Sequence, residues 1–138
     1  MSSEKMKVIA PTIVRTGVAL VILWFGVQQL IDTNAWVGLI PSWATSLSGF
    51  EASTLVIING SMEIVIGTLL LLGFFTTIIG LLSALHLLLI TYVVGYNGVG
   101  VRDFGLAMGA ISTFLYGADS FSLDAYFANR KTKQAKIV

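Results

Sequence analysis

Four long apolar stretches follow one another along the chain. They run from residues 8 to 31, 54 to 74, 76 to 96 and 102 to 117. A transmembrane helix takes about 17 to 25 mostly apolar residues. Because lipid offers no hydrogen-bond partners to an unpaired backbone, and the runs are longer than strands need, helices are favoured. The pattern predicts an all-α membrane protein, a bundle of four transmembrane helices that forms a single domain over residues 1–138.

The composition supports a membrane protein over a water-soluble one. Of the 138 residues, 56% are hydrophobic and 11% are charged, and the mean hydropathy is +0.89. Soluble domains carry about 25% charged residues. The formal net charge of +1 provides no basic face for nucleic acid. The chain has no cysteine, so disulfides, thiol chemistry and iron–sulfur clusters held by its own thiolates are excluded.

The distribution of Lys and Arg predicts the orientation. Basic residues flank the two ends of the apolar region, whereas the segment from residue 32 to residue 53 has no Lys or Arg. The flanking residues are Lys5, Lys7, Arg130, Lys131, Lys133 and Lys136. Because cytoplasmic flanks are enriched in Lys and Arg, we expect both termini to be cytoplasmic and the chain to be a multi-pass protein of the plasma membrane.

The connections between the stretches differ in length. Residues 74–77 make a tight turn, which predicts that the second and third helices are antiparallel neighbours. The connection from residue 33 to residue 53 is longer, with apolar residues at spacings of three or four and a break near Pro41. These apolar residues are Trp36, Leu39, Ile40, Trp43, Leu47 and Phe50. The segment is either an anchor in the outer interface or a lid over an outward-facing pocket.

Polar residues within the stretches share helix faces with small ones. The predicted faces are Arg15, Ala19, Ile22, Gly26 and Gln29; Asn59, Gly60, Glu63 and Gly67; Gly80, Ser83 and His86; and Arg102, Gly105, Gly109, Ser112 and Tyr116. Small residues mark close helix packing in membranes, and ionisable groups turn toward the bundle interior. We therefore expect the four faces to converge.

Glu63 and His86 form the candidate catalytic pair. They lie at nearly equal sequence distances from the 74–77 turn, so both should sit at the same depth near the bilayer centre. A carboxylate and an imidazole that face each other there can share one proton at lower cost than either group alone. The alternative roles are a hydrogen-bonded structural glutamic acid and a packing histidine.

Arg15 and an outer polar cluster are candidates for ligand binding. Arg15 lies about 10 Å inside the cytoplasmic end, and its side chain either reaches toward Glu63 or snorkels to the headgroups. The outer cluster combines Gln28 or Gln29 with Asn59, Asn97, Arg102 and Asp103 beneath the tryptophan-bearing connection. The alternative for Arg102 and Asp103 is a headgroup contact and an aspartate in the first turn of the last helix that complements its dipole.

Five segments together resemble the DoxX family of small four-helix membrane proteins. They are LWFGVQQLID with the following AW (23–36), NGSMEIVIGTLLLLGFFT (59–76), ALHLLLI (84–90), GVRDFGL (100–106) and SLD (122–124). The resemblance implies a four-helix bundle in the cytoplasmic membrane, with Glu63, His86, Arg102 and Asp103 at the family's polar positions. Some relatives are subunits of a thiosulfate:quinone oxidoreductase. Where relatives often have lysine, this chain has Gln29, which puts binding of an anionic substrate in doubt.

Three functions are consistent with these residues. The first is a quinone-linked redox protein or a subunit of a membrane oxidoreductase, in which Glu63 and His86 exchange protons with quinone and a redox partner handles the electrons. The second is a non-catalytic accessory subunit of a membrane complex, and the third is a proton-coupled carrier that would need to form a homo-oligomer. A haem is disfavoured because one histidine cannot supply two axial ligands, and no metal site is expected.

Overall fold

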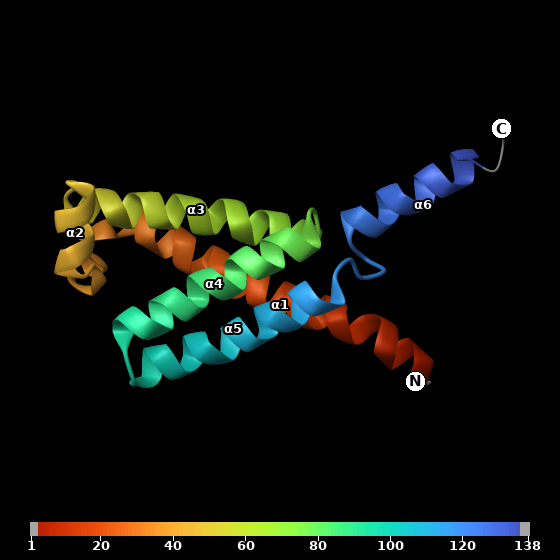
Figure 1. Ribbon diagram of the computed structural model, residues 1–138, viewed down its shortest axis with the longest axis horizontal. Coiled ribbons are helices and arrows are strands. Elements are labelled where there is room, and N and C mark those ends of the chain that lie inside the picture. Colours follow the sequence, from red (N-terminus) through yellow and green to blue (C-terminus); the bar gives the residue numbers. More distant parts are fainter. Residues whose placement is uncertain (1–2, 136–138) are drawn as a thin grey trace.

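The computed structural model describes residues 3–135, and their regular structure is helical throughout (Figure 1). The elements are α1 (Ser3–Ile31), the 3₁₀ turns η1 (Thr33–Ala35) and η2 (Val37–Leu39), α2 (Ser42–Ser48), α3 (Ala52–Leu72), α4 (Thr76–Val94), α5 (Gly98–Tyr116) and α6 (Leu123–Ala135). The four apolar stretches correspond to α1, α3, α4 and α5. The prediction of an all-helical protein is confirmed, while Lys136 lies outside the described residues.

Three of these helices are long and apolar enough to cross a membrane. Among the residues that the structure describes, α1, α3 and α4 contain windows of mean hydropathy 2.0, 2.1 and 2.2. The helix α5 has 19 residues but is less apolar, because it contains Arg102 and Asp103. It also begins four residues earlier than predicted, because the side chain of Asn97 accepts hydrogen bonds from the backbone N–H groups of Val99 and Gly100.

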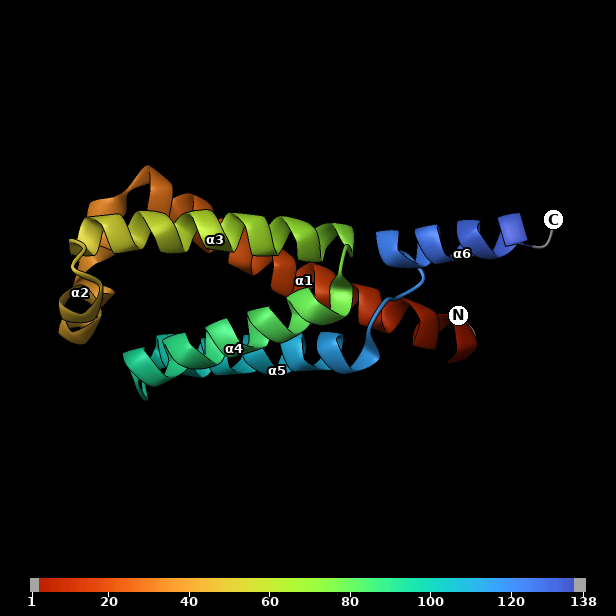
Figure 2. The ribbon, with the colours of Figure 1, turned by 45° about the horizontal axis from the view of Figure 1, so that its top comes forward.

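The long helices pack as two pairs. The helix α1 lies along α3, and α4 lies along α5, so that two layers face each other (Figure 2). Contacts between α1 and α5 join the layers. The helices α3 and α4 meet at the turn that joins them and diverge away from it (Figure 2). The sequence predicted that they are close neighbours, but α3 packs mainly against α1 and α4 packs mainly against α5.

Glycines allow the helices of each pair to approach backbone to backbone. A Cβ atom added at Gly26 of α1 would lie 2.8 Å from the carbonyl oxygen of Gly60 in α3, and one added at Gly80 of α4 would lie 2.9 Å from the backbone nitrogen of Phe114 in α5. No larger residue fits at such a crossing without a backbone shift. The predicted faces of the first two membrane stretches are therefore the packed faces, with Arg15 and Glu63 turned inward.

The predicted face of α5 was wrong except at Gly109, where an added Cβ atom would lie 2.8 Å from the side chain of Val18 in α1. Its buried residues are Gly100, Asp103, Ala107, Ala110 and Thr113, whereas a Cβ atom at Gly105 would meet nothing within 4 Å. Adjacent residues are about 100° apart around a helix, so choosing Arg102 instead of Asp103 as the inward residue rotates the whole face. The aspartate is the residue that points into the bundle.

The segment between α1 and α3 covers one end of the bundle. Residues 33–48, which we call the lid segment, fold into η1, η2 and α2 across the end opposite the α3–α4 turn (Figure 1). Pro41 separates η2 from α2, as predicted, with an extended ψ of 145°. The ring of Trp36 packs edge-on to that of Phe25 in α1, at 5.6 Å between centroids. The first turn of α1 and the whole of α6 lie toward the turn end (Figure 1).

Candidate functional site

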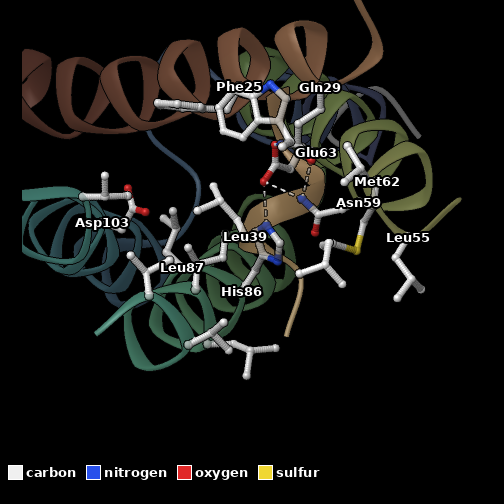
Figure 3. A pocket seen from close by; sticks show the side chains of 18 of the residues that line it. Phe25, Gln29, Leu39, Leu55, Asn59, Met62, Glu63, His86, Leu87 and Asp103 are labelled. Atoms are coloured by element: carbon white, nitrogen blue, oxygen red, sulfur yellow. Dashed lines mark hydrogen bonds and ion pairs between the residues drawn. The ribbon is translucent and has the colours of Figure 1, made fainter. Parts of the chain in front are cut away.

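Side chains from three helices converge on the carboxyl group of Glu63. Figure 3 shows His86 of α4, Gln29 of α1 and Asn59 of α3 directed toward it. The Nε2 atom of His86 lies 2.9 Å from Glu63 Oε1. The side-chain amide of Gln29 donates to Glu63 Oε2 at 2.6 Å, and the side-chain amide of Asn59 donates to Glu63 Oε1 at 3.1 Å and to Gln29 Oε1 at 2.8 Å. We call these four residues the Glu63 cluster.

The Glu63 cluster can hold one exchangeable proton without a net charge. Glu63 is 3% exposed, and the side chain of His86 is 10% exposed. With the proton on His86 the two groups form an ion pair, and with the proton on Glu63 both are neutral, so the sum of charges is zero either way. The amides of Gln29 and Asn59 hold the carboxyl group in place. Departure of the proton would leave a buried negative charge, which is costly in a low-dielectric interior.

A cavity of about 370 Å³ lies beside the Glu63 cluster, between the two helix layers and under the lid segment. Its size is within the range of sites for small molecules. Apolar side chains make up most of the wall, and the Glu63 cluster lies at its inner side. The lining residues are Val21, Ile22, Phe25, Gln29, Trp36, Leu39, Ile40, Pro41, Trp43, Ala44, Leu55, Val56, Ile58, Asn59, Met62, Glu63, His86, Leu87, Leu89, Ile90, Val93, Val94, Val99, Arg102, Asp103 and Leu106.

Arg102 and Asp103 form a second pair at the cavity wall. The Nε atom of Arg102 donates to Asp103 Oδ1 at 2.7 Å, and Asp103 is 3% exposed. The guanidinium group lies 4.2 Å from the centre of the Phe25 ring, a cation–π contact that bridges α5 to α1. Because α5 begins at Gly98, Asp103 is not in the first turn. The predicted interaction of this aspartate with the helix dipole was therefore wrong, and its partner is Arg102.

The structure brings together six of the nine predicted site residues. Glu63, His86, Gln29, Asn59, Arg102 and Asp103 all line the same cavity. Of the two glutamines that were left open, Gln29 reaches the cavity and Gln28 is absent from its wall. Asn97 was misassigned, because it is exposed and its side chain caps α5.

The prediction for Arg15 was wrong in both alternatives. Arg15 is 2% exposed, and its guanidinium group is bonded inside the protein to residues other than Glu63, so it does not snorkel out of the bundle. Its Nε atom donates to Asp119 Oδ2 at 2.6 Å, and its Nη1 atom donates to the backbone carbonyl oxygens of Leu70 and Leu71 at 2.7 and 2.6 Å. Arg15 thus bonds to two of the last carbonyl groups of α3; the Leu70 oxygen also accepts from the backbone N–H of Gly73, whereas the helix supplies no donor for the oxygen of Leu71.

The site residues that the sequence analysis missed are Asp119, in the connection between α5 and α6, and Asp124, in the first turn of α6. Asp119 also accepts hydrogen bonds from the hydroxyl of Thr12 at 2.8 Å and from the backbone N–H of Phe121 at 2.9 Å. Asp124 accepts from the backbone N–H groups of Phe75 and Thr76 and from the Thr76 hydroxyl, at 2.7 to 3.0 Å. The sequence did offer one indication of Asp119: the analysis assigned no acidic partner to Arg15, and a buried cation requires one.

Phe75 has a left-handed φ of 52°, which is rare for a residue other than glycine. The Asp124 carboxylate receives the backbone N–H groups at this turn. Asp124 therefore ties the turn between α3 and α4 to the start of α6, and Asp119 ties the connection before α6 to Thr12 and Arg15 of α1. We call Arg15, Asp119 and Asp124 the basal cluster.

The basal cluster should lose stability in acid. Burial raises the pKa of Asp119, but the hydrogen bonds from Arg15, Thr12 and Phe121 outweigh it and lower that pKa below 3.8. Burial likewise raises the pKa of Asp124, but the hydrogen bonds that it accepts from Thr76 and Phe75 outweigh burial, so this pKa is also below its ordinary value. A carboxyl group whose pKa is lower in the folded state stabilises the fold above its unfolded pKa, and this stabilisation is lost as the pH falls through the folded pKa.

We expect the unfolding temperature of the detergent-solubilised protein to decrease as the pH is lowered through 3.8, where half of the unfolded carboxyl groups are protonated while the folded ones are still ionised. Asp124→Asn should unfold at a lower temperature than the wild type at neutral pH, and the difference should shrink below pH 3.8. A difference that stays constant down to pH 2 would contradict a stabilising Asp124 carboxylate.

The fold and the cavity define a class: an all-helical membrane protein with a carboxyl–imidazole pair beside an apolar cavity. The model of the DoxX family matches residues 10–96 of the chain, so the chain belongs to the DoxX family. This range includes the Glu63 cluster and ends before Arg102 and the basal cluster's two aspartates. No curated protein and no solved structure matches the chain.

Proposed function

We propose that the chain is a quinone-linked redox protein or redox subunit of the plasma membrane. In this proposal α5 is the fourth membrane-spanning helix, the lid segment is on the outer side, and both ends of the described chain are cytoplasmic. The Lys and Arg residues near the turn end support this orientation. The pairing of Arg102 with Asp103 lowers the cost of placing α5 in the membrane, and α5 lies along α4.

The observation that carries the proposal is the position of the Glu63–His86 pair at the wall of an apolar cavity. A quinone is a neutral, lipid-soluble ring with carbonyl oxygens, and its reduction to a quinol takes up two electrons and two protons. The apolar walls fit such a ring, and the cluster provides a hydrogen-bond donor or a proton at a carbonyl oxygen. His86 and Glu63 hold and transfer the proton in this proposal. A separate redox subunit supplies the electrons, because the chain has no cysteine and one histidine.

The same contacts disfavour an anionic substrate in this cavity. The amide of Gln29 is bonded to the Glu63 carboxyl group, and the guanidinium of Arg102 is paired with Asp103. No unpaired cation in the cavity wall, which lies within the described residues, is available to offset the charge of a substrate such as thiosulfate. A neutral ligand avoids this cost.

Tryptophan fluorescence can test quinone binding. Two of the three tryptophans, Trp36 and Trp43, line the cavity, while Trp24 is 55% exposed on α1 and does not line it. Titration of the purified protein with a short-chain quinone should quench its fluorescence saturably. A variant with both Trp36→Phe and Trp43→Phe should show much weaker saturable quenching, because only Trp24, which lies behind Phe25, remains.

Mass spectrometry of the organic extract should also detect a quinone that co-purifies in mild detergent. If no quinone co-purifies and quenching does not saturate, the accessory-subunit function replaces this proposal. The observation that favours that alternative is the extent of internal pairing, since Glu63, Arg102 and Arg15 all have partners within the bundle.

A further inference from the structure

The cavity is covered on three sides. The lid segment covers it at one end, with Trp36 and Pro41 in the wall, and with Leu39 and Trp43, which are 49% and 53% exposed, reaching its outer surface. The helices converge toward the turn end, where Leu70 and Ala110 are fully buried core residues (Figure 2). On the side of α1 and α5, the guanidinium of Arg102 lies over the Phe25 ring.

The fourth side, between α3 and α4, is different. Ile58 and Met62 of α3 and Leu89 of α4 line the cavity, yet they are 50%, 39% and 53% exposed. The lid segment also has exposed lining residues, but α3 and α4 in addition diverge from each other away from their turn (Figure 2), so their exposed lining side chains stand at an opening between the two helices. Because α3 and α4 are apolar spans, this opening faces lipid rather than water.

Polarity changes steadily from the inner wall to this opening. At the inner wall Glu63 and His86 provide groups that bond to polar atoms (Figure 3). Toward the opening the lining side chains of α3 and α4 are Leu55, Ile58, Met62, Leu89, Ile90 and Val93, which carry no charge and no hydrogen-bonding N–H or O–H group. The cavity therefore matches a ligand that has a polar head and a hydrocarbon tail.

The size of the cavity requires the tail to leave it. A volume of about 370 Å³ is near the lower end of the range for small-molecule sites. A ring with its substituents takes up much of this space, so a chain of many carbons cannot be enclosed as well.

We propose that the cavity opens sideways into the bilayer between α3 and α4, and that this opening holds the hydrocarbon tail of a long-chain quinone whose ring lies against the Glu63 cluster. This inference rests on the proposed quinone function and adds the ligand class and the entry route to it. The ligand then enters from the membrane and does not pass beneath the lid segment. Met62 and Leu89 form the two walls of the opening and determine which tails fit.

Narrowing the opening tests this inference. Met62→Trp and Leu89→Trp each add bulk to one wall, while Ile57→Trp and Leu85→Trp add the same bulk at lipid-exposed positions of the same helices that do not line the cavity. Binding of a radiolabelled long-chain quinone and of its tail-less ring is measured by separating bound from free ligand. All variants are assayed in the same detergent, so that partitioning of the tail into micelles is common to all.

We expect Met62→Trp and Leu89→Trp to bind the long-chain quinone about tenfold more weakly than the wild type, because a few carbons of tail contact are lost. Binding of the tail-less ring should change less than twofold, and the two control variants should match the wild type. The two walls are tested separately, so that one misfolded variant does not decide the result.

Other outcomes would overturn the inference. If the two wall variants bind both ligands as the controls do, or lose both ligands equally, the tail does not lie between α3 and α4. Such results would leave the proposed function intact, because the ring would still bind the wild type. If neither ligand binds the wild type, the proposed function fails, and this inference fails with it.

Discussion

Replacing Glu63 with glutamine should lower the rate of quinone reduction by about 10²- to 10⁴-fold, the usual contribution of a positioned proton donor or acceptor. Glutamine has nearly the same shape and can still accept a hydrogen bond from Gln29, but it cannot give up or take up a proton with His86. The rate is measured in membranes that contain the redox partner. We expect the variant to accumulate to the wild-type level, because its bonding partners remain within reach.

Glu51→Gln is the matched control for this prediction. Glu51 is exposed and lies at the start of α3, outside the cavity wall. The Glu51→Gln variant should therefore reduce quinone at the wild-type rate. A wild-type rate in Glu63→Gln would exclude a role of Glu63 in proton transfer. If Glu63→Gln instead reduces the amount of redox subunit that co-purifies, the Glu63 cluster serves assembly.

Replacing Arg15 with methionine should destabilise the protein by about 3 to 5 kcal/mol, the usual effect of removing one partner of a buried ion pair. The side chains of Arg15 and Asp119 are 2% and 1% exposed, so the substitution leaves the Asp119 carboxylate buried without its cation. It also removes the donor to the carbonyl oxygens of Leu70 and Leu71. The free energy of unfolding is measured by denaturant titration of the detergent-solubilised protein.

Arg130→Met provides the control for Arg15→Met. Arg130 is exposed on α6, where its guanidinium lies 5.3 Å from the Tyr126 ring, so its loss should change the unfolding free energy by less than about 0.5 kcal/mol. Adding Asp119→Asn to Arg15→Met should recover part of the lost stability, because it removes the unpaired charge. Equal unfolding free energies for Arg15→Met and Arg130→Met would show that the buried pair does not stabilise the fold.

The membrane helices and the central contact could be predicted because both depend on local periodicity. Apolar runs give the helices directly, and the turn after α3 sets the depth of Glu63 against that of His86, since each residue advances along its helix by a fixed rise. The turn also makes α3 and α4 antiparallel. The 2.9 Å contact between Glu63 and His86 follows from this register, although the two helices have other close packing partners.

The contacts that escaped prediction depend on residues that are distant in sequence or outside regular patterns. Asp119 lies in the short connection after α5, where no periodicity indicates which way a side chain points, and its partner Arg15 is 104 residues away. The face of α5 was ambiguous because Arg102 and Asp103 are adjacent and both polar. Packing decides between them, since the shorter aspartate fits the interior and the longer arginine reaches across to Phe25.

Inside the long helices, beyond the first turns of α1, each described Asp, Glu, Arg and His side chain is paired, and this pairing affects how the protein responds to voltage. Glu63 with His86, Arg102 with Asp103 and Arg15 with Asp119 each sum to zero charge when the first pair holds its proton. A membrane potential therefore exerts little net force on the resting bundle. In the proposed orientation, a proton that moves between the cytoplasm and the Glu63 cluster crosses part of the electric field, which is worth about 2.3 kcal/mol per charge per 100 mV over the full membrane. Proton delivery to the cavity would then be coupled to the energised state of the membrane, even though the helices themselves are not.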